Sequence, residues 1–269
     1  MSVPTTRARR PVLRVLLALV LLGTVCLGYA FFIEPHWIEV THHRVQVPGL
    51  QQSLKVAHLT DLHLRGWGRR EQKLLQLLEE QKPDLIVITG DTSSPGATDA
   101  DRYQLLSKLQ APLGVHAVRG NWELWAPMED EEGLYRKAGI HSLMNESLRV
   151  GDALWLVGLD DALAGAPDVA KGFGGVPAGQ PCVTLMHSPA LFDETAGRCA
   201  LALAGHTHGG QVRLPGVGAL WLPPGSGNYE AGWYERGGSK LYVSRGLGNS
   251  ILDLRFLCRP ELAILTLGP

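Results

Sequence analysis

Short apolar runs recur along the chain, and the polar side chains that follow them are Asp, His and Asn. Each run is too short for a helix but long enough for a buried strand. The seven side chains that come directly after these runs are Asp61, His63, Asp91, Asn121, His187, His206 and His208. Because ligand sites in α/β sheets form beyond the carboxyl ends of strands, we expect these side chains to converge.

The spacing of apolar residues between these runs predicts the fold class. The segments 71–81, 99–109 and 128–138 have helical periodicity. The expected strands are 55–59, 84–89, 115–118, 154–158, 183–187, 200–205, 241–244 and 262–267. Strand–helix alternation followed by many short strands predicts an α/β domain of two packed sheets flanked by helices. We find no internal repeat, and we assign this domain to 54–269 and a linker to 34–53.

The N-terminal segment predicts a membrane anchor. The basic residues of 1–14 are Arg7, Arg9, Arg10 and Arg14, and the nineteen residues 15–33 that follow carry no charge. A helix of that length crosses the hydrocarbon core of a bilayer. A cleaved export signal is the alternative. Arginines before the span and Glu34 after it place residues 1–14 in the cytoplasm and the domain outside.

The arginine pair adds a second interpretation of the same segment. The stretch from Arg9 to Arg14 resembles a twin-arginine export signal, a route that carries folded proteins. The alternative is that these arginines only fix the orientation of the helix.

Charge and cysteine content narrow the classes of partner. Residues 1–33 contain four of the 25 basic side chains and none of the 26 acidic ones, so the remainder has a net charge of −5. Such a balance argues against a nucleic-acid partner. The four cysteines, Cys26, Cys182, Cys199 and Cys258, form no CxxC pair. We expect them to be small buried residues, although a disulfide is permitted outside the cytoplasm.

The type of the seven side chains indicates a metal site. Imidazole, carboxylate and amide donors without thiolate suit Mn²⁺, Fe or Zn²⁺ rather than Ca²⁺. Taken singly, each residue has an ordinary structural alternative, such as a helix cap, a turn or a buried histidine bound to a carbonyl group.

The order of the motifs resembles that of the calcineurin-like metallophosphoesterases over about residues 54–267. The order is Asp-x-His, Gly-Asp, Gly-Asn, a single His, and then Gly-His-Thr-His-Gly-Gly-Gln at 205–211, which points to the membrane-anchored bacterial branch. The resemblance implies a four-layer αββα fold and two divalent metals, with Mn²⁺ favoured. Together with the predicted anchor, it implies a location at the inner membrane of a bacterium.

The resemblance also implies a role for each of the seven residues. The first metal would be held by Asp61, His63 and His208. The second metal would be held by Asn121, His187 and His206. Asp91 would bridge the two metals and, with Asn121, would support catalysis by a metal-bridging hydroxide.

One position departs from the family pattern. The third motif reads Gly-Asn-Trp-Glu at 120–123, with Trp122 where the family has a histidine that protonates the leaving group. An indole cannot act as a general acid, which favours a leaving group that needs no proton, such as a phosphate. Among relatives, the lipid A pathway enzymes that cleave UDP-diacylglucosamine share this departure. Trp122 either contacts substrate or packs in the core.

Two arginines complete the predicted site. Arg119 and Arg245 either contact a substrate phosphate or are ordinary surface or packing residues. The leading prediction is a hydrolase of phosphate esters or anhydrides, acting on a lipid-linked or envelope substrate at a membrane. The alternatives are a nucleotide phosphodiesterase and a non-catalytic metal-binding scaffold. We infer no obligate protein partner.

Overall fold

The computed structural model describes residues 9–152 and 154–269, so Arg7 lies outside the described residues. The α-helices are α1 (Arg9–Phe32), α2 (Arg69–Gln81), α3 (Asp99–Leu106), α4 (Asn121–Trp125), α5 (Glu131–Lys137), α6 (Val169–Phe173) and α7 (Phe192–Thr195). Short 3-10 helices are η1 (Glu34–His36), η2 (Pro189–Leu191) and η3 (His208–Gly210). The strands are β1 (Glu39–Gln46), β2 (Leu54–Leu59), β3 (Leu85–Thr89), β4 (Val115–Val118), β5 (Ile140–Ser142), β6 (Glu146–Val150), β7 (Leu154–Gly158), β8 (Cys182–Leu185), β9 (Leu201–Ala204), β10 (Arg213–Leu214), β11 (Gly218–Ala219), β12 (Gly232–Arg236), β13 (Ser239–Val243) and β14 (Glu261–Gly268).

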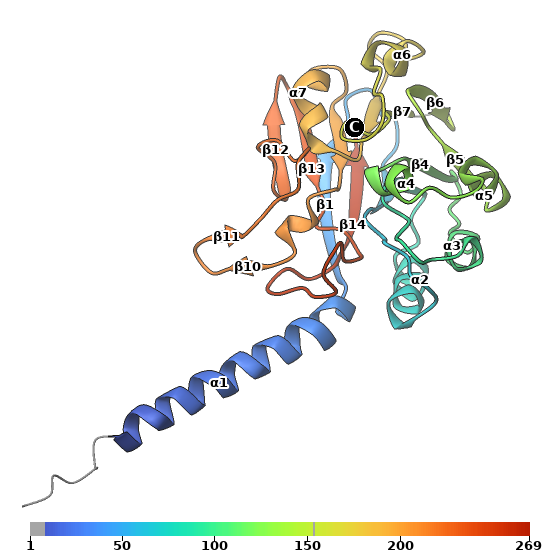
Figure 1. Ribbon diagram of the computed structural model, residues 1–269. Helices are drawn as coiled ribbons and strands as arrows, with labels where there is room; N and C mark the ends of the chain where they lie inside the picture. Colours follow the sequence, from blue (N-terminus) through green and yellow to red (C-terminus); the bar gives the residue numbers. More distant parts are fainter. Residues whose placement is uncertain (1–8, 153) are drawn as a thin grey trace, which may run out of the picture.

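Two six-stranded mixed sheets form the centre of the domain (Figure 1). The first has the order β1-β14-β2-β3-β4-β5, in which only the β14–β2 pair is antiparallel. The second has the order β12-β13-β9-β8-β7-β6 and is parallel from β13 to β7. The strands that precede the predicted ligands, β2, β3, β4, β8 and β9, are therefore parallel central strands within their own sheets.

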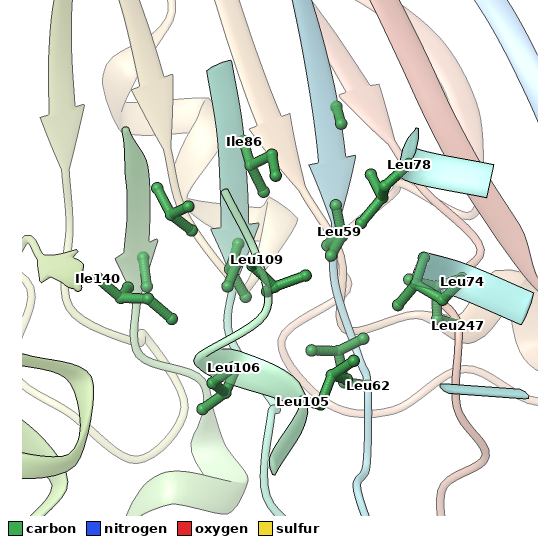
Figure 2. Packing of buried hydrophobic residues seen from close by; sticks show 14 of the residues in the cluster. Leu59, Leu62, Leu74, Leu78, Ile86, Leu105, Leu106, Leu109, Ile140 and Leu247 are labelled. Carbon is green, nitrogen blue, oxygen red and sulfur yellow. The ribbon is translucent and has the colours of Figure 1, made fainter. Parts of the chain in front are cut away.

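The core is layered as the fold prediction required. Alternate residues of a strand point to opposite faces, so Ile86 packs under the helices while Val87 packs against the second sheet. Figure 2 shows the first of these layers, where Leu74 and Leu78 of α2 lie on one side of Leu59 of β2 and Ile86 of β3 lies on the other. A third cluster covers the outer face of the second sheet beneath α6 and α7. The prediction of two packed sheets flanked by helices is confirmed.

Helix α1 projects away from the domain (Figure 1). The apolar span Pro11–His36 is 26 residues long, enough to cross a membrane. Its side chains are exposed from Pro11 to Val25, as Leu21 is at 65%, so this part of the helix is not buried in the domain. The carbonyl oxygen of Ala30 accepts a hydrogen bond from the Arg255 backbone N–H at 3.0 Å, so the helix ends against the domain.

The segment 34–53 differs from the linker that we expected. It contains β1, which pairs in parallel with β14 over eight residues, from Glu39 with Glu261 to Gln46 with Gly268. β1 is an edge strand, and most of its residues are exposed or half-buried. Its mixed polar sequence therefore lacks the apolar run that identified the central strands.

Two of the buried cysteines form a disulfide, which the sequence permitted but did not predict. Cys182 and Cys199 form a disulfide, with 5.1 Å between their Cα atoms. Cys182 begins β8, and Cys199 lies just before β9, which pairs with β8. Strand pairing brings the two residues together in a way that their separation in the sequence does not indicate. Cys258 is a buried free thiol, as expected.

We predict that removing the disulfide lowers the free energy of unfolding. The Cys182→Ala/Cys199→Ala variant releases a loop of 17 residues, for which the chain-entropy model gives a loss of about 3 kcal/mol. The measurement is urea unfolding with and without a reductant. The control is Cys26→Ala, which keeps the disulfide and should unfold like the wild type. A reductant effect that persists unchanged in the double variant would contradict the prediction.

Candidate metal centre

The seven predicted ligands come together at the carboxyl ends of five strands in the two sheets. The residues of the first cluster have ligand atoms within 4.8 Å of one another and are Asp61, His63, Asp91 and His208. The residues of the second cluster meet the same distance and are Asp91, His187 and His206. The Oδ1 atom of Asn121 lies 3.1 Å from Nε2 of His187, which adds Asn121 to the second cluster. All seven residues are buried.

Asp91 lies between the two clusters. Its Oδ2 atom is 3.6 Å from Nε2 of His63 and 3.3 Å from Nε2 of His187. A single carboxylate oxygen thus faces a histidine of each cluster. This is the position that a bridging carboxylate requires.

The far ring nitrogens of the second-cluster histidines bind backbone oxygens. Nδ1 of His187 lies 2.7 Å from the carbonyl oxygen of Thr89, and Nε2 of His206 lies 2.7 Å from that of Pro224. A carbonyl accepts only a proton donor, so these nitrogens carry the hydrogen. When each ring is neutral, its other nitrogen therefore presents a lone pair to the cluster, as metal ligation requires.

Five of the seven ligands have a left-handed backbone conformation. The residues with φ between 43° and 71° are Asp61, His63, Asp91, His206 and His208. For residues with a Cβ atom this conformation costs roughly 1–2 kcal/mol. Such strain concentrates where backbone geometry must aim a functional side chain.

Close backbone contacts also require glycine beside Asp91. A Cβ atom at Gly120 would lie 2.3 Å from Oδ1 of Asp91, and one at Gly90 would lie 2.7 Å from Nδ1 of His187. Gly90 also has a φ of 82°. The glycines of the Gly-Asp and Gly-Asn motifs therefore make room for the ligands of both clusters.

Glu123 is a positioning residue that sequence reasoning did not identify. Its buried carboxylate accepts hydrogen bonds from the backbone N–H groups of Asp91, Thr92, Ser93 and Gly120, at 2.6 to 3.2 Å. It ties the loop after β3 to the loop after β4. The sequence signal that could have identified Glu123 is its position as the last residue of the Gly-Asn-Trp-Glu motif.

The pKa values show how strongly the cluster groups interact. Burial raises the pKa of Asp91 to about 7, although the adjacent His187 opposes this rise. Burial would lower the pKa of His187, but the Asp91 carboxylate outweighs it and raises the pKa to about 10. Burial lowers the pKa of His63 and of His208, which keeps both rings neutral and able to ligate. This donor set fits divalent cations, with one group of donors on each side of Asp91.

Trp122 lies over the clusters rather than in the core. Its ring meets His63 edge-on, with 5.9 Å between ring centroids, and meets Trp125 in the same way at 5.6 Å. Its backbone N–H donates to Oδ1 of Asp91 at 2.9 Å. The indole is half-buried and lines the pocket described below.

The two predicted phosphate-binding arginines are engaged elsewhere. The Arg119 guanidinium donates to Asp160 at 2.9 to 3.1 Å. Arg245 donates to Glu39 at 2.8 Å and to Glu261 at 3.2 Å. Neither lines the pocket, so the structure does not bring them together with the metal ligands at the substrate side.

A pocket of about 520 Å³ opens onto the clusters. Its polar base includes Asp91, Asn121, His206 and His208. Its apolar walls, which no motif indicated, include Trp122, Trp125, Leu220, Trp221, Ile251 and Leu252. Within the described part of the chain, no Lys or Arg lines it. The charge of a bound phosphoryl group would therefore be balanced by cations at the clusters.

We predict that Asp91→Asn abolishes binding of the metal pair. The substitution removes the charge that offsets repulsion between two cations, so metal content should fall from two ions per chain to one or fewer. The measurement is elemental analysis after dialysis, with circular dichroism to check folding. Asp152→Asn, on an exposed turn away from the clusters, removes the same charge and should keep both ions. Two retained ions in Asp91→Asn would refute the bridging assignment.

Comparison with known proteins agrees with the geometry. The model of the calcineurin-like phosphoesterase family matches residues 54–210. The chain is 34% identical to the metallophosphoesterase YkuE of Bacillus subtilis, covering 89% of each chain. It is 32% identical to the phosphodiesterase YaeI of Escherichia coli, covering 89% of this chain and 92% of that one.

A third relative bears on α1. The chain is 28% identical to a bovine transmembrane protein with a metallophosphoesterase domain, covering 97% of this chain and 63% of that protein. Together with the exposed apolar α1, this relative indicates membrane anchoring. The family match and the clustered ligands lead to one conclusion: the chain belongs to the calcineurin-like phosphoesterase family and is a metal-dependent phosphoester hydrolase.

Proposed function

We propose that the protein hydrolyses a phosphodiester or pyrophosphate bond in a lipid-linked substrate, using two divalent cations, with Mn²⁺ favoured. The observation that carries the proposal is the pocket, in which a polar base of metal ligands meets apolar walls without a cationic side chain. Such a pocket suits a molecule with a phosphoryl group at one end and an apolar portion at the other.

The seven converging side chains divide into two sets of possible cation ligands. Asp61, His63 and His208 would hold one cation, and Asn121, His187 and His206 the other, with Asp91 shared. Bound cations supply Lewis-acid stabilisation of phosphoryl charge and lower the pKa of water. Asp91 and Asn121 would support catalysis as cation ligands, Asp91 by binding both cations and Asn121 by binding the second. The backbone N–H of Trp122 and the carboxylate of Glu123 hold Asp91 in place.

The pocket has no evident general acid. Among its described lining residues, the titratable side chains are Asp91, His206 and His208, and all three belong to the clusters. The ring nitrogen of His206 that does not face the cluster is bound to Pro224. General-acid help is worth about 10²–10⁴ in rate, so we infer a leaving group of low pKa. The pyrophosphate bond of UDP-diacylglucosamine combines such a leaving group with acyl chains.

A nucleotide phosphodiesterase is the second candidate. The aromatic faces of Trp122, Trp125 and Trp221 along the pocket favour it, since a base stacks on such rings. The curated relative named a phosphodiesterase is compatible with both candidates. A non-catalytic scaffold is disfavoured because all seven ligand positions are present and converge.

We also propose that the domain lies outside the cytoplasm of a bacterium. The disulfide between Cys182 and Cys199 supports this, because such bonds persist in oxidising compartments. Export by the twin-arginine route through Arg9 and Arg10 stays a prediction.

The test is metal-dependent hydrolysis by the full chain. After chelation and dialysis, Mn²⁺, Zn²⁺ or Fe²⁺ is added back with bis(p-nitrophenyl) phosphate, UDP-diacylglucosamine or cyclic nucleotides. The proposal predicts turnover of the aryl diester and of the lipid-linked pyrophosphate. Turnover of cyclic nucleotides alone would favour the second candidate, and no metal-dependent turnover would favour the scaffold.

We predict that Trp122→His weakens the dependence of the rate on leaving-group pKa. The wild type should slow steeply as that pKa rises, because no residue protonates the leaving oxygen. The histidine variant should gain most on alkyl esters and little on pyrophosphates. Trp122→Phe is the matched control, since it removes the indole without adding a proton donor. A shallow slope in the wild type would show that another group donates the proton.

A further inference from the structure

Two loops carry an exposed apolar surface at the mouth of the pocket. One loop contains β10 and β11, and the other connects β13 to β14. We call this surface the apolar collar; its side chains are 40% to 71% exposed and are Leu214, Val217, Leu220, Trp221, Ile251, Leu252 and Leu257. An apolar surface of this kind, gathered at a functional site, marks a contact with another apolar body.

Hydrogen bonds join the two loops of the collar to each other. The Phe256 backbone N–H donates to the carbonyl oxygen of Gln211 at 3.0 Å, and that of Arg213 donates to Phe256 at 2.9 Å. The Gln211 side chain donates to the carbonyl oxygen of Leu252 at 2.7 Å. The collar is therefore one connected surface rather than two independent tips.

The same segment joins the collar to the end of α1. The ring of Phe256 packs edge-on against Tyr29 of α1 at 6.4 Å. The Glu34 carboxylate accepts hydrogen bonds from the backbone N–H groups of Leu257 and Cys258. In Figure 1 the β10–β11 hairpin and the dark red loop before β14 both extend on the side of the domain from which α1 leaves.

Charge in the two loops is almost fully compensated. Arg213 pairs with Glu230, and Asp253 pairs with Arg65. Arg255 is fully buried. A charged protein surface is thus a poor match for the collar. The boundary between the headgroups and the acyl chains of a bilayer is a good match, since Trp residues such as Trp221 are enriched at the membrane interface.

We propose that the apolar collar inserts into the surface of the membrane that α1 spans, so that substrate enters the metal site from the bilayer. Leu220, Trp221, Ile251 and Leu252 belong both to the collar and to the pocket wall. The acyl chains of a substrate can therefore stay in apolar surroundings while its phosphoryl group reaches the clusters. This entry route rests on the proposed hydrolase function, whereas the membrane contact does not.

The membrane contact is tested by fluorescence quenching. The full chain is placed in nanodiscs of phosphatidylcholine brominated near the headgroup end of its acyl chains. In the wild type, the bromolipid should quench the emission of Trp221. The fraction of tryptophan emission that is quenched should therefore fall in Trp221→Phe. Trp155→Phe, in β7, is the matched control. It should lower the total emission without lowering the amount that the bromolipid quenches. Absence of quenching at Trp221 would overturn the proposal.

The entry route is tested with two diesters that share a leaving group. One is p-nitrophenyl hexadecyl phosphate in the bilayer, and the other is p-nitrophenyl methyl phosphate in solution. Val217→Glu adds a charge to the collar outside the pocket wall and should lower kcat/KM for the membrane-borne ester about tenfold, with little change for the soluble ester. Ala170→Glu adds the same charge on α6, at the opposite end of the domain in Figure 1, and should change neither.

The outcomes separate the two proposals. Equal rates of the membrane-borne ester in Val217→Glu and wild type, or equal losses on both esters, would overturn the entry route. If the wild type hydrolyses neither ester with Mn²⁺, the hydrolase proposal fails. Quenching at Trp221 would still decide whether the collar contacts the membrane.

Discussion

The burial of Asp91 between two groups of histidines is the constraint on which the rest of the site depends. A buried carboxylate is costly unless charge and hydrogen bonds compensate it. Glu123 fixes the backbone around Asp91, and Gly90 and Gly120 permit the close approach of neighbouring loops. The left-handed conformations of the ligands are tolerated because the surrounding sheets are packed on both faces. Packing and backbone hydrogen bonds thus hold the ligands in place, which favours a fixed distance between the two donor groups.

The membrane anchor and the metal centre share contacts with one segment, residues 255–258. Glu34, just after α1, holds the backbone of Leu257 and Cys258. Two residues earlier, the fully buried Arg255 donates to the carbonyl oxygens of Arg245 and Gly248, and its guanidinium lies 3.4 Å from Nδ1 of His208. A guanidinium bound mainly to carbonyl groups organises a loop rather than pairing with an acid. The end of α1 is therefore joined through Arg255 to a first-cluster ligand, so the contacts at the base of α1 and those at the pocket belong to one hydrogen-bonded network.

The ligands could be predicted from the sequence because each lies directly after a central strand, where composition and order both carry a signal. Edge strand β1 could not be predicted from the sequence, because half-exposed strands mix polar and apolar residues. The Cys182–Cys199 disulfide could not be predicted either, because its formation depends on which strands are neighbours in the sheet. The apolar wall of the pocket was also not predictable, because such a wall requires only apolar area from loops and no fixed spacing in the sequence. Its residues include Leu220, Trp221, Ile251 and Leu252.

Trp122 and the apolar collar support the proposed class of substrate for independent physical reasons. An indole at this position contributes no proton, which restricts the leaving group to one that is stable as an anion. The collar contributes apolar contact and no charge, which favours a substrate whose binding energy comes from its hydrocarbon portion. A water-soluble alkyl phosphate satisfies neither condition. A lipid-linked pyrophosphate satisfies both, since its phosphate leaves unaided while its chains remain in the membrane.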